Sequence, residues 1–355
     1  MFPLEVGVGG MMLLALILYA LSGGADFGAG VWDLLASGPR KEQQRALIAQ
    51  AIAPVWEANH VWLIVVVVLL FVAFPTAFAA ISTALHIPLV LMLVGIVLRG
   101  SAYVFRAYGI QQDVSHRRWG VVFAISSTIT PVMLGVVLGA VSSGTIRVDV
   151  DTHLVSTDFV SSWWAPFPFA IGFLVLVMFV FLAAVYLIHE TQDVLVKADF
   201  RMRALIAGGV VFVMAWISFG LSVEGAPLIY EGLWGRVWSV PFQGVMGMMA
   251  TGALTALWVR WYVAARILAI TQVVLMILGW GLAQFPFVLV PDLPLDVASA
   301  PDSVLRAVLI ALGAGFVILI PSFWYLYWVF KVKKNEDAYL VANDNVRFLE
   351  VDEED

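Results

Sequence analysis

The chain has 355 residues, of which 62% are hydrophobic and only 12% are charged, and its mean hydropathy is +0.96. Soluble domains carry about 25% charged residues, so this composition excludes a soluble protein and predicts an all-α polytopic membrane protein. Cys is absent, which excludes disulfides and thiolate metal ligands. The formal net charge of −6 comes from acids that cluster at the C-terminus, and we expect no nucleic-acid partner.

Apolar stretches long enough to cross a bilayer follow one another along the chain. We predict nine spans, at roughly 4–22, 54–74, 78–98, 119–142, 164–188, 204–222, 241–259, 263–283 and 304–330. The first ten residues contain no basic segment, so the first stretch is expected to be a retained span and not a cleaved signal peptide. We therefore expect one transmembrane domain over 1–334 and an acidic tail over 335–355.

Basic residues alternate between the two sides of the membrane in a way that predicts an orientation. If the N-terminus lies outside, all but three of the 19 Lys and Arg residues fall on the inner side. The exceptions are Arg147, Arg236 and Arg306. Inner segments of bacterial membrane proteins are enriched in Lys and Arg, so we expect a periplasmic N-terminus and a cytoplasmic C-terminus. The amphiphilic segment 39–50 is expected to lie along the inner surface.

The stretch IAPVWEANHVWLI, residues 52–64, places polar side chains at the start of an apolar span. In chain order it carries Trp56, Glu57, Asn59, His60 and Trp62. Pro54 suits the first turn of a helix, and we expect one unbroken helix from there to residue 74. Glu57 and His60 would share a face of it. An ionisable residue within a span costs about 2.5–3.5 kcal/mol on insertion scales and indicates a functional site.

Three ionisable residues are expected at the inner ends of the first three spans. They are Asp26 in GADFGAG, Glu57, and Arg99 in GIVLRGSAYVFR. The helix N-terminus and Arg99 favour the charged form of Glu57, whereas burial and Asp26 oppose it. Such a cluster can bind and release protons, and it can equally be an ion pair that locks three helices together. Spacing alone does not distinguish these two interpretations.

Two histidines, His60 and His86, are expected inside the membrane on neighbouring helices. Such a pair is compatible with haem ligation or with a proton relay. A membrane histidine that only forms a hydrogen bond with a nearby Ser, Thr or carbonyl is the commoner case, and Ser82 and Thr83 stand close to His86 in the sequence. The sequence contains no complete catalytic site and no metal-ligand spacing.

Small residues recur at helical spacing in two segments. Gly24 and Gly28 belong to the first, and Gly135, Gly139 and Gly144 to the second. Small residues at this spacing let membrane helices approach closely. We expect both segments to lie at helix–helix contacts.

At these motifs the chain resembles subunit II of the cytochrome bd quinol oxidases, the respiratory terminal oxidases of bacteria. The stretch IAPVWEANHVWLI is similar to the second-helix signature of that family. Further similarities are the glycine-flanked Asp26, Arg99 at the end of the third span, TPVMLGVVLG (130–139), FPFVLVPD (285–292) and YLYWVFK (325–331). They occur in the family's order from residue 23 to 331.

The resemblance implies a heterodimer with a larger subunit I in the bacterial cytoplasmic (inner) membrane, with small accessory subunits in some members. Such a complex oxidises quinol and reduces oxygen to water. Two haems b and one haem d lie in subunit I, so this chain would hold no metal, would have no catalytic residue of its own and would not be active alone. A bound structural quinone and membrane lipid are also implied.

The resemblance also implies roles for single residues. Glu57, with Asp26 and Arg99 around it, would give protons access from the cytoplasm. Trp62, with Trp56, would line an oxygen route toward subunit I.

The chain departs from the family pattern at several positions. Gly23 stands where many members have a further acid, and Glu57 stands where Asp is frequent. Asn59, His60 and His86 are interpreted as packing or local tuning. Two alternatives remain open at this point: a secondary transporter or permease, and a cytochrome that binds haem through His60 and His86.

Overall fold

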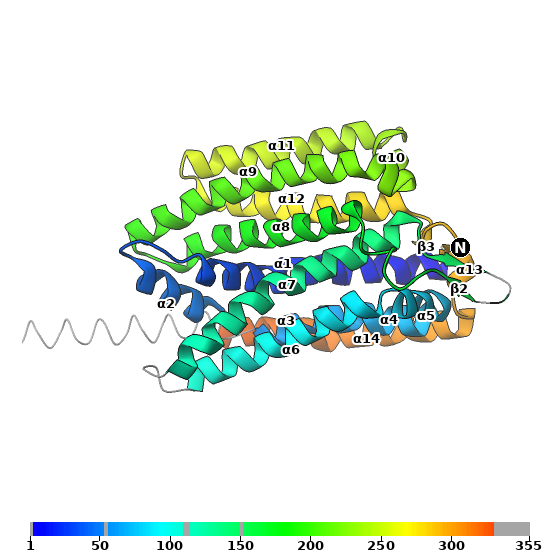
Figure 1. The fold of residues 1–355 in the computed structure, drawn as a ribbon, viewed down its shortest axis with the longest axis horizontal. Coiled ribbons are helices and arrows are strands. Elements are labelled where there is room, and N and C mark those ends of the chain that lie inside the picture. The colour runs from blue at the N-terminus through cyan, green and yellow to red at the C-terminus, as the bar shows by residue number, and fades with distance from the viewer. Residues whose placement is uncertain (1–2, 53–55, 109–113, 150–151, 153, 330–355) are drawn as a thin grey trace, which may run out of the picture.

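The computed structural model describes residues 3–52, 56–108, 114–149, 152 and 154–329 (Figure 1). In these ranges, eight helices are long and apolar enough to cross a membrane, or nine if one bent pair counts as a single span. The all-α polytopic fold with about nine spans is therefore confirmed for the described residues. The predicted tail 335–355 lies outside them.

The helices run back and forth along the long axis of the molecule (Figure 1). In chain order they are α1 (Leu4–Leu34), α2 (Lys41–Ile52), α3 (Trp56–Asn59), α4 (Val61–Ala73), α5 (Pro75–Ala84), α6 (His86–Tyr108), α7 (Val114–Ser143), α8 (Pro166–Glu190), α9 (Val194–Gly225), α10 (Pro227–Trp234), α11 (Ser239–Trp258), α12 (Tyr262–Gln284), α13 (Leu295–Ala298) and α14 (Asp302–Tyr327). Two antiparallel hairpins pair β1 (Arg147–Val148) with β2 (Val155–Ser156) and β3 (Phe287–Leu289) with β4 (Leu293–Pro294).

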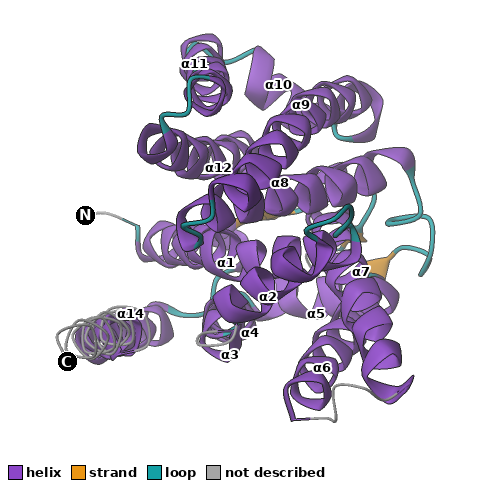
Figure 2. Cartoon of the chain, turned by 90° about the vertical axis from the view of Figure 1, so that its left-hand side faces the viewer, coloured by secondary structure: helices purple, strands orange, loops and turns teal. Residues whose placement is uncertain are grey.

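The core follows α1 and α8, which lie side by side in the middle of the bundle (Figure 2). Their contact face is made of small and aromatic residues, most of which are fully buried. By contrast, α14 lies at the edge of the bundle and exposes most of its surface. Helices α2 and α5 lie near opposite ends of the molecule, and we name these the α2 end and the α5 end.

The second and third spans differ from the prediction. The helix expected from 54 to 74 is interrupted at His60, between α3 and α4. The predicted turn near Pro75 is confirmed, because proline ends the preceding helix, and α5 is bent by 117° against α4. The third span expected at 78–98 begins only at His86. Residues 78–84 belong to α5, whose small buried residues pack it against the bundle.

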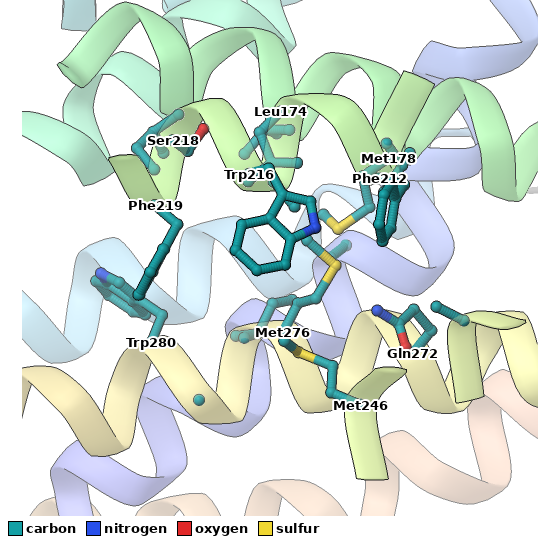
Figure 3. Close-up of a pocket in the computed structure, with 18 of the residues that line it drawn as sticks. Leu174, Met178, Phe212, Trp216, Ser218, Phe219, Met246, Gln272, Met276 and Trp280 are labelled. Atoms are coloured by element: carbon teal, nitrogen blue, oxygen red, sulfur yellow. The ribbon is translucent and has the colours of Figure 1, made fainter. Parts of the chain in front are cut away.

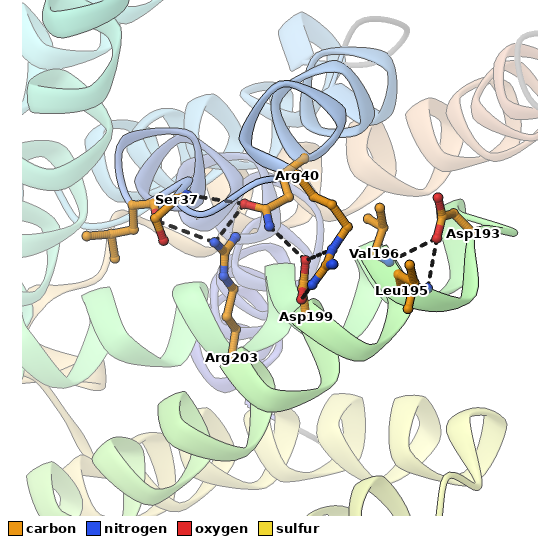
Figure 4. A network of polar contacts seen from close by, with 9 residues as sticks. Ser37, Arg40, Asp193, Leu195, Val196, Asp199 and Arg203 are labelled. Atoms are coloured by element: carbon orange, nitrogen blue, oxygen red, sulfur yellow. Dashed lines mark hydrogen bonds and ion pairs between the residues drawn. The ribbon is translucent and has the colours of Figure 1, made fainter.

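The amphiphilic segment 39–50 becomes α2, and a polar network fastens it to α9 (Figure 4). The Arg40 guanidinium donates two hydrogen bonds to the Asp199 carboxylate, at 2.8 and 2.5 Å. The buried Gln44 side chain donates to Asp199 and accepts from Arg203, both at 2.8 Å. Because the same carboxylate and amide serve both helices, α2 is held in one position over this end of the bundle.

The predicted close contacts at small residues are confirmed at four of the five glycines. A Cβ atom on Gly28 would lie 2.1 Å from the Phe179 carbonyl oxygen, and one on Gly135 would lie 2.6 Å from the Gly172 Cα atom. Gly24 and Gly139 are similarly close to α8. Gly144 is different: it ends α7 with a φ of +79°, in the left-handed region that glycine adopts without strain.

An ion pair at the α5 end ties the two hairpins together. The Arg147 guanidinium donates to both oxygens of Asp292, at 2.8 and 2.9 Å, and the Val148 N–H donates to the same carboxylate at 2.8 Å. Partial burial opposes ionisation of Asp292, but these donors outweigh it and lower its pKa. The carboxylate is therefore held in its charged form.

This pair predicts a pH-dependent stability. Because the pKa of Asp292 is lower in the folded than in the unfolded state, its contribution is present at neutral pH and is lost as the pH falls through the lowered value. Asp292→Asn is expected to lower the melting temperature of the complex at pH 7 and to lower it by less at pH 3. Thermal unfolding at both pH values measures this. An equal decrease at both would contradict it.

Candidate functional site

The polar centre of the bundle is a contact between α1 and the residue that ends α3. Asp26 of α1 is 9% exposed, and Asn59 is 2% exposed. The Asn59 amide nitrogen donates a hydrogen bond to the Asp26 carboxylate. The interruption at His60 therefore lies next to the residue that meets this carboxylate.

Arg99 of α6 completes this centre. Its side chain is 2% exposed and interacts electrostatically with Asp26 and with Tyr19. The guanidinium carbon lies 4.6 Å from the ring centroid of Phe27 and 5.3 Å from that of Phe123. Such contacts stabilise a buried cation. Within the described part of the chain, the Arg99 Nε and Nη2 atoms form no hydrogen bond.

The structure thus brings together two of the three ionisable residues predicted to meet. Asp26 and Arg99 interact across α1 and α6, and Asn59 joins them. Glu57 lies two residues before Asn59 on α3. Helix α3 contacts α1. The side chains of Glu57 and Trp56 lie outside what the structure describes.

Trp62 lies in an aromatic stack between α4 and α14. Its ring stacks on Phe316 at 6.2 Å and on Phe323 at 5.6 Å between centroids. Trp62 is buried, whereas α14 is otherwise largely exposed. The stack therefore forms an apolar seam one turn from the polar centre.

The two histidines lie in different surroundings. His60 packs against the rings of Tyr19 and Phe27, at 6.0 and 5.9 Å between centroids, and its buried Nδ1 atom forms no hydrogen bond in the described part of the chain. His86 is exposed at the start of α6, packs against Phe159 and contacts the Thr83 carbonyl at 3.0 Å. The expectation that His86 lies near the middle of the membrane is wrong, because α5 takes up the residues that were counted into the third span.

Sequence reasoning missed Tyr19, which is 1% exposed and interacts electrostatically with both Asp26 and Arg99. A signal was present: Tyr19 precedes Asp26 by seven residues, which places both on one face of a helix. Phe27 and Phe123 were also missed. The contact of Phe123 with Arg99 joins α7 to α6 and depends on packing that no local pattern encodes.

A cavity of about 380 Å³ lies between α1, α7, α8, α9, α11 and α12 (Figure 3). Most of its lining is apolar, including Trp216, Met246 and Met276. Gln272 and Ser218 also line it, and their buried Oε1 and Oγ atoms form no hydrogen bond in the described part of the chain. The cavity can accommodate an apolar molecule that carries a few polar atoms.

Comparisons with known proteins agree with this arrangement. The sequence model of one family, cytochrome bd terminal oxidase subunit II, matches residues 4–330. Cytochrome bd-I ubiquinol oxidase subunit 2 of Escherichia coli K12 is 27% identical over 305 residues, which are 77% of this chain and 78% of that protein. A putative cytochrome bd menaquinol oxidase subunit II of Bacillus subtilis is 23% identical over 348 residues, 92% of this chain and 97% of that one.

The fold is also that of a solved oxidase. A chain of the bd oxidase from Geobacillus thermodenitrificans superposes with a TM-score of 0.76 at 22% identity, covering 93% of this chain and 99% of that chain. Because the family model matches residues 4–330, the interpretation as a secondary transporter is wrong. The chain belongs to the family of cytochrome bd terminal oxidase subunit II, and so to a haem-containing, quinol-oxidising complex of the bacterial inner membrane.

Proposed function

We propose that this subunit gives protons access, from the cytoplasmic side, to the oxygen-reducing centre of a partner subunit I. The hydrogen bond between Asn59 and Asp26, next to the buried Arg99, is the observation that carries this proposal. The proposal requires the N-terminus outside and the α2 end in the cytoplasm. The basic residues of α2 and of the neighbouring loops support that orientation.

The chemistry of the centre suits transient proton binding. Asp26 can accept a proton, and Arg99 stabilises the carboxylate after the proton leaves. The Asn59 amide holds one carboxylate oxygen of Asp26 in place. Glu57, two residues from Asn59, is proposed as the second carboxyl of the same path.

Carboxamide variants test this role. Asp26→Asn and Glu57→Gln keep shape and hydrogen bonding but cannot carry a proton. Each is expected to slow quinol-driven oxygen reduction by about 10²-fold, at the lower end of what acid–base groups contribute, while the haem content of the complex is unchanged. Oxygen uptake and the visible spectrum of the purified complex measure both. Parental oxygen uptake in both variants would refute proton access through this centre.

We propose that the complex holds two haems b and one haem d, all in subunit I, and that small accessory subunits can join it. His60 and His86 do not fit a haem of this chain as a pair. They are separated by α4 and α5, and α4 alone is about 20 Å long. His60 is also enclosed by two aromatic rings. In this arrangement the subunit binds no haem and is inactive alone.

We also propose that Trp62 and Trp56 line an oxygen route. The support is the apolar stack of Trp62 on two rings of α14. Oxygen is a small apolar molecule and partitions into such a seam, whereas protons follow the polar centre next to it. The two substrates would then approach subunit I by neighbouring paths.

We further propose that the cavity holds a structural quinone. Its apolar walls suit an isoprenoid tail. The Ser218 hydroxyl can donate a hydrogen bond to a carbonyl oxygen of the ring, and the Gln272 Oε1 atom can accept one from a hydroxyl of the reduced ring. Ala215→Trp, which fills the cavity, is expected to reduce the quinone extracted per complex. Val210→Trp, at an exposed position of the same helix, is the control and is expected to retain it. Equal quinone content in both variants would contradict the assignment.

A further inference from the structure

The contact between α1, α6 and α7 repeats its polar pattern toward the α2 end. Asp33 follows Asp26 by seven residues on α1, and Arg106 follows Arg99 by seven on α6. Seven residues are about two helical turns, or roughly 10.5 Å along each axis. Asp26 and Asp33 are therefore expected on one face of α1, and Arg99 and Arg106 on one face of α6. Each carboxylate then has one guanidinium of α6 beside it.

The second level lies closer to the surface. Asp33 is 5% exposed, and its carboxylate accepts a hydrogen bond from the Arg106 Nη1 atom at 2.9 Å. The Arg45 Nε atom of α2 lies 3.8 Å from its other oxygen. Both arginine side chains are partly exposed, at 22% and 37%. The arginines of this level are therefore more exposed than Arg99, although Asp33 itself is buried.

The hydroxyl of Ser127 lies beside α1 between the two levels. Gly30 stands four residues after Asp26 and three before Asp33, and a Cβ atom there would lie 2.2 Å from the Ser127 Oγ atom. Ser127 is 0% exposed, and its Oγ forms no hydrogen bond within the described part of the chain. The Nε and Nη2 atoms of Arg99 are also buried and form no hydrogen bond among the described residues.

Buried polar atoms of this kind are sites where proteins hold internal water. A hydroxyl both donates and accepts a hydrogen bond, so it can pass a proton on without changing its own charge. Phe123 packs on the other side of the same space: its ring contacts the guanidinium groups of Arg99 and Arg106, at 5.3 and 5.2 Å. One aromatic ring therefore contacts the guanidinium groups of both levels.

We propose that Asp33 collects protons at the α2 end and passes them, through water and the Ser127 hydroxyl, to Asp26. In each transfer, Asp33 gives its proton to a water molecule, Ser127 accepts one proton as it releases another, and Asp26 takes up the released proton. The proposal rests on the proposed function of Asp26. It adds the part of the path between the α2 end and Asp26. This part uses Asp33 and Ser127, which do not belong to the polar centre.

Proton uptake by the complete oxidase tests the outer carboxyl. Asp33→Asn is expected to slow uptake during a single turnover by about 10-fold, less than a group at the reacting centre contributes because water can bypass it. Asp33→Glu is expected to restore the rate. Asp199→Asn is the control, since it removes an equally paired carboxylate at the same end, outside the α1–α6–α7 contact. A pH-indicator dye reports the uptake, and the haem spectrum reports the assembly.

A labelling experiment tests the middle of the path without using activity. The chain contains no Cys, so Ser127→Cys introduces its only thiol. A small, positively charged methanethiosulfonate is expected to modify this thiol, as measured by the mass of the subunit. Ser218→Cys, also buried but facing the apolar cavity, is expected to stay unmodified. Protection of both thiols would overturn the hydrated path.

The outcomes separate this inference from the proposed function. If Asp26→Asn slows proton uptake while Asp33→Asn and Ser127→Ala take up protons at the parental rate, the path through Asp33 is refuted and the role of Asp26 stands. If Asp26→Asn itself has the parental rate, both proposals fail. Slow uptake in all three variants, with the parental rate in Asp199→Asn, supports both.

Discussion

Replacing Arg99 by leucine is expected to destabilise the subunit by about 3–5 kcal/mol, the usual cost of removing one partner from a buried charge pair. The guanidinium lies between Phe27 and Phe123 and interacts with Asp26. Leucine leaves the Asp26 carboxylate in an apolar space without its cation. The yield of purified complex and its thermal unfolding measure the loss.

A double variant separates the effect of the unpaired charge from the effect of the lost side-chain volume. Asp26→Asn combined with Arg99→Leu removes both charges, so assembly is expected to recover most of what Arg99→Leu loses. Oxygen reduction is not expected to recover, because the carboxyl is absent. Arg306→Leu is the control, because Arg306 forms an exposed pair with Asp302 on α14. If the single and the double variant are equally unstable, the loss arises from packing and not from the unpaired charge.

Gly28→Leu is expected to prevent folding of the subunit. The added Cβ atom alone would lie 2.1 Å from the carbonyl oxygen and 2.5 Å from the carbonyl carbon of Phe179. These are backbone atoms of α8, so no side-chain rotation relieves the contact, and the two central helices must separate. We expect a cost at or above the upper end of overpacking, about 3 kcal/mol, and little subunit in the membrane.

The matched control for this variant is Gly220→Leu on α9. No atom lies within 4 Å of the Cβ position at Gly220, so a larger side chain there meets open space. Normal amounts of assembled complex are expected. Western blots of membrane fractions and the haem content of the purified complex compare the two variants. Equal amounts of both would show that α1 and α8 tolerate separation.

The sequence was sufficient for the number of spans and for the turn at Pro75, but not for the residue at which the third span begins. Hydropathy and the alternation of basic residues gave about nine spans, because both depend on composition. They failed for residues 78–84, because α5 is as apolar as a crossing helix. Pro75 marked the first break, whereas the second, at Leu85, contains neither proline nor glycine.

The candidate site was predictable in part. Asp26 and Arg99 were expected to meet at the inner ends of the first and third spans, and they do interact. They lie inside their helices and not at the ends, because α1 continues to Leu34 and α6 to Tyr108. The partner of Asp26 was not predictable, since the hydrogen bond from Asn59 accompanies an interruption at His60. Ser127 was also not predictable, because its position against Gly30 depends on how α7 packs on α1.

The ion pair between Arg147 and Asp292 determines when the two hairpins can join during biosynthesis of the subunit. The ribosome adds Arg147 145 residues before the partner carboxylate, with the α8, α9, α11 and α12 spans still to be inserted. During that interval Arg147 has no counter-ion from the second hairpin. The periplasm-facing surface of the proposed orientation is therefore finished late in biogenesis, and a chain truncated before residue 292 cannot close it.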